Sequence, residues 1–302
     1  MKIGIVILNY NGEKDTIKCL ESIQSLNKKD SIEVIVVDNG SKEPFQKSPS
    51  LNLPITVIYN DQNLGFSQGN NKGIKKAIEK GASHVLILNN DTIIDKNLIR
   101  ELLSVADSDD RVGIVVPKIY FAKGYEFHKD RYSEDEKGKV IWYAGGLIDW
   151  NNVIGFHRGV DEIDHGQYNK AEETEFATGC CMLAKTEIFK KVGFLDPAYF
   201  LYYEDSDFSK RVQKAGYRIL FVPKAILWHK NAASAGGSGS SLQDYYIARN
   251  RLLFGMRYAP LEKKAVLLKE SLSLLLRGRN WQKRGIIDFY LGRLGKGSYS
   301  EF

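Results

Sequence analysis

A chain of 302 residues can bury a large core, so one main domain with an appendage is the expected organisation. Its 43 Lys and Arg against 37 Asp and Glu leave a formal charge of +6, a dispersed excess that suits an anionic small molecule or an acidic lipid surface and argues against nucleic acid. The apolar runs are shorter than the roughly 18 residues that a membrane span needs. The three cysteines follow neither a metal-ligand spacing nor a disulfide framework, which favours a reducing cytosol.

Strand and helix patterns alternate through the first 120 residues. The predicted strands, with their polar tips, are 2–10, 33–41, 55–61 and 84–95, and the predicted helices are 15–26 and 65–81. This alternation is typical of βαβ units, and strands that are apolar on both faces are typical of a sheet covered by helices on each side. The fold class is therefore predicted to be α/β, with a mostly parallel sheet flanked by helices.

The regular pattern weakens between residues 121 and 175 and returns at Thr178. The middle segment is polar and predicts loops and short strands. The Gly/Ser-rich segment 231–241 predicts a mobile lid that closes over a bound ligand, and helices with basic flanks follow it. We therefore expect an α/β domain at 1–240, with halves at about 1–120 and 121–240, and a helical tail at 241–302.

Polar side chains follow three of the predicted strands: Asn9, Tyr10 and Asn11, then Asp38, then Asn89, Asn90 and Asp91. Ligands of such sheets bind at the carboxyl ends of the strands, so these tips are expected to converge on one crevice. A divalent cation prefers oxygen ligands, which makes Asp91 a candidate metal ligand. The alternative is that Asp91 or Thr92 only caps a following helix, and turn chemistry alone also accounts for Asp38.

Eight short motifs occur in order along the chain: VILNYNG, VVDNGS, NLGFSQGNNKGI, LNNDT, TGCCMLAKTEIFKKVGFLD, YYEDSDFSKRVQKAGY, WHK and YYIARNRLLF. Together they resemble the inverting family 2 glycosyltransferases of the GT-A fold, and the pattern is most similar to the rhamnosyltransferase-type members. The resemblance implies transfer of a sugar from a nucleoside diphosphate to an acceptor hydroxyl, with inversion at the anomeric carbon.

The same resemblance implies substrates and a place in the cell. It favours dTDP-rhamnose as donor, with UDP-linked galactofuranose or hexosamine as the alternative. The acceptor is a saccharide or a lipid-linked saccharide in bacterial polysaccharide and cell-wall synthesis. We expect a cytoplasmic enzyme, peripheral on the inner face of the plasma membrane. The basic and aromatic tail suits an interfacial helix on anionic lipid, although its apolar stripe can equally dock on the catalytic domain.

Roles then fall on particular residues. The donor-binding residues implied are Asn9, Tyr10, Asn11, Asp38, Asn63, Gly65, Gly69, Asn70, Asn90 and Asp91. Asp91 and His229 are implied to bind a divalent cation, Mg²⁺ or Mn²⁺, that bridges the diphosphate. The family's Asp-x-Asp is Asn89-Asn90-Asp91 here, which leaves metal affinity with one carboxylate fewer. Thr178 and Gly179 are implied to line the acceptor side.

An inverting displacement needs a carboxylate that accepts the proton of the acceptor hydroxyl. By the motif match this general base is Asp205, with Glu204 beside it. The alternative for Glu204 and Asp207 is that they complement the dipole at the start of a helix. The adjacent Cys180 and Cys181 have no basic neighbour in sequence, so we expect them to be packing residues and not nucleophiles.

Other classes of protein fit less well. A dinucleotide-dependent oxidoreductase needs Gly-x-Gly-x-x-Gly after the first strand, where this chain has LNYNGEKD. A nucleotidyltransferase typically has a Gly-rich, basic loop at the same place. A non-catalytic sugar-nucleotide-binding or polysaccharide-binding protein is the alternative if the missing carboxylate matters. The sequence leaves the oligomeric state open.

Overall fold

The computed structural model describes residues 2–26, 31–231 and 239–300. Its strands are β1 Lys2–Asn9, β2 Ser31–Asp38, β3 Ile55–Tyr59, β4 His84–Asn89, β5 Thr92–Ile94, β6 Val112–Phe121, β7 Ile141–Tyr143, β8 Gly146–Asp149, β9 Ile154–His157, β10 Glu172–Glu173, β11 Cys181–Lys185 and β12 Arg218–His229. Its helices are α1 Glu13–Gln24, α2 Gly65–Glu79, α3 Leu98–Ala106, α4 Thr186–Val192, α5 Glu204–Lys214, α6 Ser241–Tyr258, α7 Leu261–Arg277 and α8 Asn280–Tyr290, with a single 3₁₀ turn at Lys129–Arg131.

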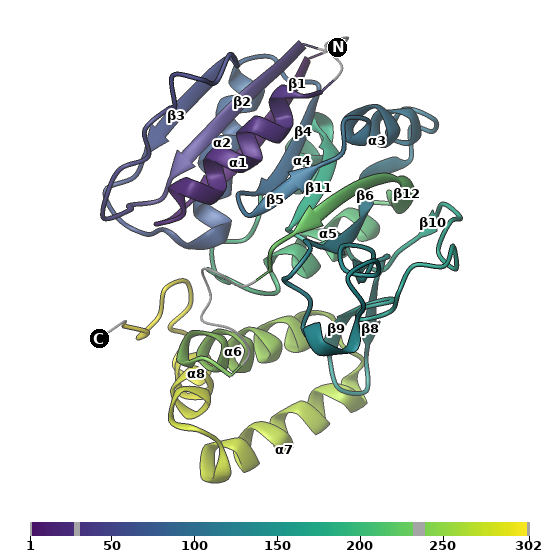
Figure 1. Cartoon of the computed structure of the whole chain (residues 1–302). Coiled ribbons are helices and arrows are strands. Elements are labelled where there is room, and N and C mark those ends of the chain that lie inside the picture. Colours follow the sequence, from purple (N-terminus) through teal and green to yellow (C-terminus); the bar gives the residue numbers. More distant parts are fainter. Residues whose placement is uncertain (1, 27–30, 232–238, 301–302) are drawn as a thin grey trace.

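A ten-stranded sheet forms the centre of the molecule (Figure 1). Its order is β10-β12-β6-β11-β4-β1-β2-β3, with β5 added to β12 and β7 to β6. The strands β3, β2, β1 and β4 run parallel to one another, and β6 is parallel to β12. Between these two groups, β11 is antiparallel to both β4 and β6. The predicted α/β fold is confirmed. The sheet is mixed because β11 enters it from the second half of the chain.

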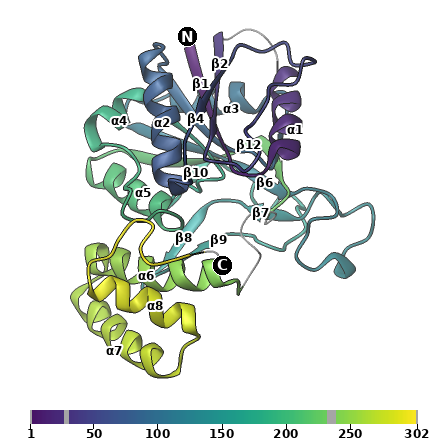
Figure 2. The same ribbon diagram turned by 90° about the vertical axis from the view of Figure 1, so that its left-hand side faces the viewer.

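Helices cover both faces of this sheet. Figure 2 shows α2, α4 and α5 on one face and α1 with α3 on the other. The strands β1, β2 and β4 are buried along most of their length, which explains why their sequences are apolar on both sides.

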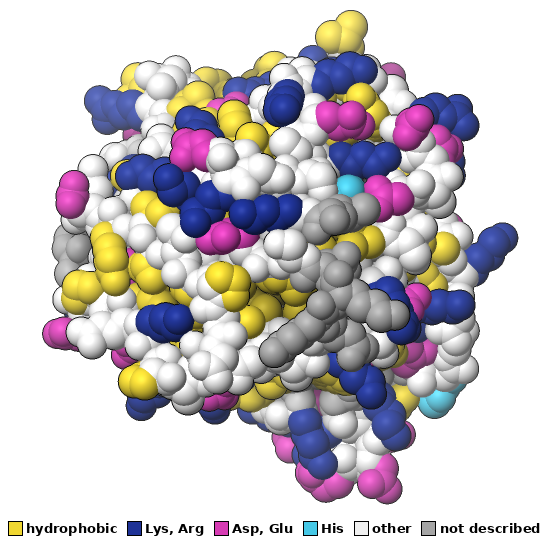
Figure 3. All heavy atoms as spheres, turned by 90° about the horizontal axis from the view of Figure 1, so that it is seen from above, with side chains coloured by type: hydrophobic (Ala, Val, Ile, Leu, Met, Phe, Trp, Pro, Cys, Tyr) yellow, Lys and Arg dark blue, Asp and Glu magenta, His cyan; other side chains and the backbone are white. Residues whose placement is uncertain are grey.

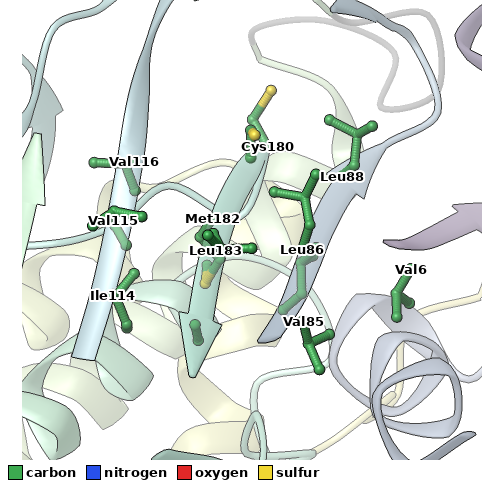
Figure 4. Packing of buried hydrophobic residues seen from close by; sticks show 14 of the residues in the cluster. Val6, Val85, Leu86, Leu88, Ile114, Val115, Val116, Cys180, Met182 and Leu183 are labelled. Carbon is green, nitrogen blue, oxygen red and sulfur yellow. The ribbon is translucent and has the colours of Figure 1, made fainter. Parts of the chain in front are cut away.

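The two halves of the main domain share one apolar core. Figure 4 shows Met182 and Leu183 of β11 between β4 and β6. Leu183 is paired with Leu86 on one side and with Val115 on the other, and all three side chains are buried. Because β11 completes the sheet begun by the first half, the strand ends at the polar edge are held by long-range packing and not by local turns alone.

One local interpretation of the sequence is wrong. Asp91 and Thr92 do not cap a helix, because Thr92–Ile94 forms strand β5, which pairs with β12. The next helix begins only at Leu98, after Asn97. A distant strand, which local sequence cannot reveal, recruits this segment into the sheet.

The polar middle of the chain forms the short hairpin of β8 and β9, as the turn residues predict. The predicted lid at 231–241 falls largely on 232–238, which lie outside the described residues. At its end, the Ser240 hydroxyl accepts a hydrogen bond from the backbone N–H of Gln243 and caps α6.

The tail folds as three helices against the main domain (Figure 1). Phe254 of α6, Leu267 of α7 and Ile286 of α8 belong to the main core. Among the described residues, no helix is long and apolar enough to cross a membrane. On the face turned away from the tail, positive and negative side chains are interspersed (Figure 3).

Candidate active site

The carboxyl ends of β1, β2 and β4 meet at one edge of the sheet. Asn9, the last residue of β1, is paired with Asp38, the last residue of β2. Leu8 is paired with Asn89 at the end of β4. The predicted convergence of the polar strand ends is confirmed, since the parallel register places the three tips side by side.

A chain of hydrogen bonds ties these tips together. Asn9 Nδ2 donates to Asp38 Oδ2 over 2.9 Å, and the Thr16 hydroxyl donates to Asn9 Oδ1 over 2.8 Å. Asn90 Nδ2 in turn donates to Thr16 Oγ1 over 3.0 Å. Asn9 and Asn90 therefore fix the backbone around the site, and Thr16, on α1, joins them although sequence reasoning did not single it out.

The Asp38 carboxylate holds the loop that follows β2. It is 2% exposed and accepts hydrogen bonds from the backbone N–H groups of Ser41 and Phe45, at 2.9 and 2.8 Å. Asn11, in the left-handed region at φ 53°, accepts from the N–H of Lys42 in the same loop, and Tyr10 precedes it half-buried. The structure thus gives Asp38 a role in shaping the donor side through this loop.

Sequence reasoning missed Asn39, which follows Asp38 and is 1% exposed. Its Nδ2 donates to Asn63 Oδ1 over 3.0 Å, and its Oδ1 accepts from Asn60 Nδ2 and from the backbone N–H of Leu64. In the sequence, the Asp-Asn-Gly-Ser run reads as an ordinary turn, so the long-range contacts of its asparagine give no local signal.

Gly65 and Gly69, which the resemblance places in the donor pocket, lie close to other parts of the protein. A Cβ at Gly69 would lie 2.5 Å from a methyl group of Leu8, and one at Gly65, where φ is +77°, would lie 2.5 Å from the ring of Phe200. Both glycines therefore seat α2 against the protein itself. Asn70, which directly follows Gly69, is 1% exposed, and its Oδ1 has no hydrogen-bond partner among the described residues.

Asp91 and His229, which are 138 residues apart, meet beside the strand ends. His229 Nε2 lies 3.0 Å from Asp91 Oδ1, because β5 pairs with the end of β12. Burial raises the pKa of Asp91, but the charge and hydrogen bond of His229 and the charge of Lys230 outweigh it, so the pKa is lowered overall. Asp91 is therefore ionised at neutral pH. Lys230, which sequence reasoning did not assign, is buried and paired with Asp15.

The donor set of this pair fits a divalent cation. The pair offers a carboxylate oxygen and an imidazole nitrogen, both ligand types that divalent cations accept, and His229 Nδ1 is buried with no hydrogen-bond partner among the described residues. The ring of Trp142 packs edge-on against the His229 ring, with 4.6 Å between the two ring centroids, and this contact restricts the orientation of His229. Among the described residues no group of three His, Cys, Asp or Glu side chains gathers around one point.

Asp205 lies against the loop that contains Thr178 and Gly179, and this loop adjoins the end of β4, because the Asn89 N–H donates to the Cys180 carbonyl over 2.8 Å. Its Oδ2 accepts a hydrogen bond from the Gly179 N–H over 3.0 Å, and its Oδ1 accepts from the Ser206 N–H. The ring of Phe66 packs against Gly179. The structure thus brings together the two predicted acceptor-side motifs, which are 26 residues apart. Burial raises the pKa of Asp205, while its hydrogen bonds lower it less, which makes the carboxylate a stronger base.

The neighbouring acids have different surroundings. Glu204 is 4% exposed, and its Oε2 has no partner among the described residues. Asp207 is fully buried and accepts from Arg211, Arg257 and Tyr258, so it ties α5 to α6. The expectation that Asp207 is structural agrees with these contacts. Asp207 does more than complement the helix dipole, because its bonds to Arg257 and Tyr258 are long-range.

Glu204→Gln is expected to stabilise the protein increasingly as pH rises. Burial and the charge of Asp205 hold the pKa of Glu204 well above its usual range in the folded state. Below about pH 4 the Glu204 carboxyl is protonated in both the folded and the unfolded state. Above its unfolded pKa the carboxyl ionises in the unfolded chain but stays protonated in the folded chain, so Glu204 favours unfolding. Denaturant unfolding at pH 4.5 and pH 8 tests this; a difference between variant and wild type that does not grow with pH contradicts it.

The fold and site together define a class of protein. A mixed sheet covered by helices, with a polar edge of strand ends and an Asp–His pair beside it, is the arrangement of a GT-A-fold transferase. The chain belongs to glycosyl transferase family 2, whose family model matches residues 4–193. It is a glycosyltransferase.

Known proteins resemble it over most of its length. The low-salt glycan biosynthesis hexosyltransferase Agl10 of Haloferax volcanii is 28% identical over 252 residues, which are 83% of this chain and 74% of that protein. The N-acetylglucosaminyl-diphospho-decaprenol L-rhamnosyltransferase of Mycobacterium tuberculosis is 26% identical over 254 residues, 79% of each chain. The crystal structure of GalNAc-T7 with UDP, GalNAc and Mn²⁺ has a TM-score of 0.67 at 17% identity. That match spans 95% of this chain and 54% of the other, and it shows the GT-A fold alone.

Proposed function

We propose that this protein transfers a sugar from a nucleoside diphosphate to an acceptor hydroxyl with inversion, using Asp205 as general base. The observation that carries the proposal is the Asp205 carboxylate, held against the Gly179 amide and made more basic by burial. It accepts the hydroxyl proton as the acceptor oxygen attacks the anomeric carbon. The bond from that carbon to the diphosphate breaks on the opposite face, and the nucleoside diphosphate leaves with the electron pair.

Asp91 and His229 are the residues that would hold a divalent cation, Mg²⁺ or Mn²⁺. When bound, the ion neutralises charge that grows on the leaving diphosphate. Asn9, Asp38 and Asn39 keep the loops after β1 and β2 in place for the nucleoside.

The proposed donor is dTDP-rhamnose, and the proposed acceptor is a saccharide carried on a lipid diphosphate. The similarity to an L-rhamnosyltransferase that acts on N-acetylglucosaminyl-diphospho-decaprenol supports both. UDP-linked galactofuranose or hexosamine is the alternative donor. A thermal-shift screen of dTDP-rhamnose, UDP-galactofuranose and UDP-N-acetylglucosamine with Mn²⁺ tests this. A ligand at 100 times its dissociation constant stabilises by about 2.7 kcal/mol. A response to a UDP sugar alone would reject dTDP-rhamnose.

The tail is proposed to rest on an anionic membrane surface, where such an acceptor is found. Leu261, Leu272 and Leu276 of α7 are 84%, 57% and 79% exposed, and their spacing places them within about 60° of one helix face. Residues 261–300 contain nine Lys and Arg against three Asp and Glu, an excess equal to the net charge of the whole chain. Exposed leucines beside a concentrated positive charge are the pattern of an interfacial helix.

Replacing Leu261, Leu272 and Leu276 by Gln is expected to abolish co-sedimentation with vesicles rich in phosphatidylglycerol, which the unchanged chain should show at low salt and lose as ionic strength rises. Point changes are preferable to removing the tail, because Asp288 of α8 binds the buried Tyr245 hydroxyl of α6. The control replaces three exposed aromatic residues elsewhere, Tyr59, Phe127 and Phe156, by Ser. Equal binding by both triple variants would show that α7 does not contact lipid.

A further inference from the structure

The loop that leads into α5 has an unusual backbone. Phe200, Tyr202 and Tyr203 have φ of 61°, 69° and 71°, in the left-handed region that side chains other than glycine rarely adopt. Such conformations persist only where the surroundings hold them, and they cluster at functional sites. The loop ends directly at Glu204 and Asp205, so its shape sets where the proposed base lies.

Two fully buried residues of α6 hold this loop. Asn250 Nδ2 lies 2.8, 2.8 and 2.9 Å from the carbonyl oxygens of Tyr199, Leu201 and Tyr202. Arg249 Nη2 donates to the Tyr199 carbonyl over 3.1 Å, and Arg249 Nε donates to Asn250 Oδ1 over 3.0 Å, which orients the amide. The carbonyls of Leu201 and Tyr202 are thereby satisfied from the tail, whereas that of Tyr199 also accepts from the Leu201 N–H within the loop.

The same loop also contacts the start of α2. The Phe200 carbonyl accepts from the backbone N–H groups of Phe66 and Ser67, at 2.7 and 3.3 Å. The Phe66 ring touches Gly179, whose N–H binds Asp205. One loop therefore fixes the base and the start of α2 relative to each other.

We propose that Arg249 and Asn250 are positioning residues: they clamp the 199–203 loop and thereby hold Asp205 against Gly179. The role rests on the proposed function of Asp205. It assigns the tail a part in catalysis, because the YYIARNRLLF motif supplies the hydrogen bonds that the strained loop lacks. Arg249 and Asn250 contact none of the proposed donor-binding residues themselves, and the loop reaches the donor side only through the start of α2, so loss of the clamp should affect turnover more than donor binding.

Asn250→Leu keeps the size of the side chain and removes the donor. With dTDP-rhamnose and Mn²⁺, we expect turnover to fall roughly 10- to 100-fold, since small displacements of a catalytic group have effects of that size. The KM for the donor should change less than turnover, because Asn250 bonds directly to the loop that carries the base and reaches the donor side only through the start of α2. Amide hydrogen exchange at Phe66 and Ser67 should speed up, because their shared acceptor is released.

The matched control is Arg251→Gln on the same helix, which breaks an ion pair with Glu270 and a bond to the Asn152 carbonyl but no contact with the loop. It should lower stability and leave turnover and exchange at Phe66 unchanged. Intermediate losses of turnover are expected for Asn250→Ser, which retains one donor, and for Arg249→Lys. These two variants replace Asn250→Leu in the test if that variant does not fold. The clamp would be overturned if all these variants turned over as fast as Arg251→Gln. It would also be overturned if the donor KM rose while turnover was kept. If the wild type has no transferase activity, the proposed function fails, and the exchange rates still test the clamp.

Discussion

Asp205→Asn is expected to reduce turnover by roughly 100-fold or more and to leave nucleotide affinity nearly unchanged. The amide is isosteric, and its single oxygen can still accept from one of the two N–H groups, Gly179 or Ser206, but it cannot take a proton from the acceptor hydroxyl. Steady-state kinetics with a nucleoside diphosphate titration measures both quantities. Near-normal turnover would reject Asp205 as the base.

The pH profile gives a second test of the same residue. A base must be ionised, so turnover in the wild type should fall as pH decreases through the pKa of Asp205. Burial raises that pKa, so the fall should begin above the usual value of about 3.9. This acidic limb should be missing from the residual activity of Asp205→Asn.

Asp207→Asn provides the matched comparison, two residues along the same helix. Asp207 pairs with Arg211 and Arg257 and accepts from Tyr258, so the change should lower the unfolding temperature. Asp205→Asn should lower it less, because a carboxylate with a raised pKa does not stabilise the fold when ionised and the amide loses only one of the two backbone hydrogen bonds. If both variants lose stability equally, Asp205 is a structural residue like its neighbour.

The strand tips could be predicted from the sequence, because the apolar pattern locates the strands and the polar residues that end them follow directly. Parallel strands place their carboxyl ends at one edge, so Asn9, Asp38 and Asn89 had to converge once β1, β2 and β4 were recognised. The meeting of Gly179 with Asp205, and of Asp91 with His229, was implied by resemblance to a family and is now seen as geometry.

What the sequence does not reveal is which polar groups the protein uses for itself. Asp38 looks like a free carboxylate at a strand tip, but it binds two amides of its own loop. Asn39 and Asn250 look unremarkable and yet organise loops distant in sequence. Such roles depend on tertiary contacts between residues 24 to 51 positions apart, which neither local periodicity nor turn chemistry encodes.

Asp91→Asn and His229→Ala are each expected to weaken nucleoside diphosphate binding on the order of 100-fold with Mn²⁺ present and little with a chelator present. Both side chains would bind the ion directly, and among the described residues no third His, Cys, Asp or Glu gathers with them to compensate. Calorimetry with UDP and dTDP, with and without Mn²⁺, separates metal-dependent from metal-independent binding. Asp95→Asn is the control, since its carboxylate accepts the Asn97 N–H at the far end of β5. Losses that persist in chelator would mean that Asp91 and His229 act by joining β5 to β12, because the ion contributes nothing under that condition.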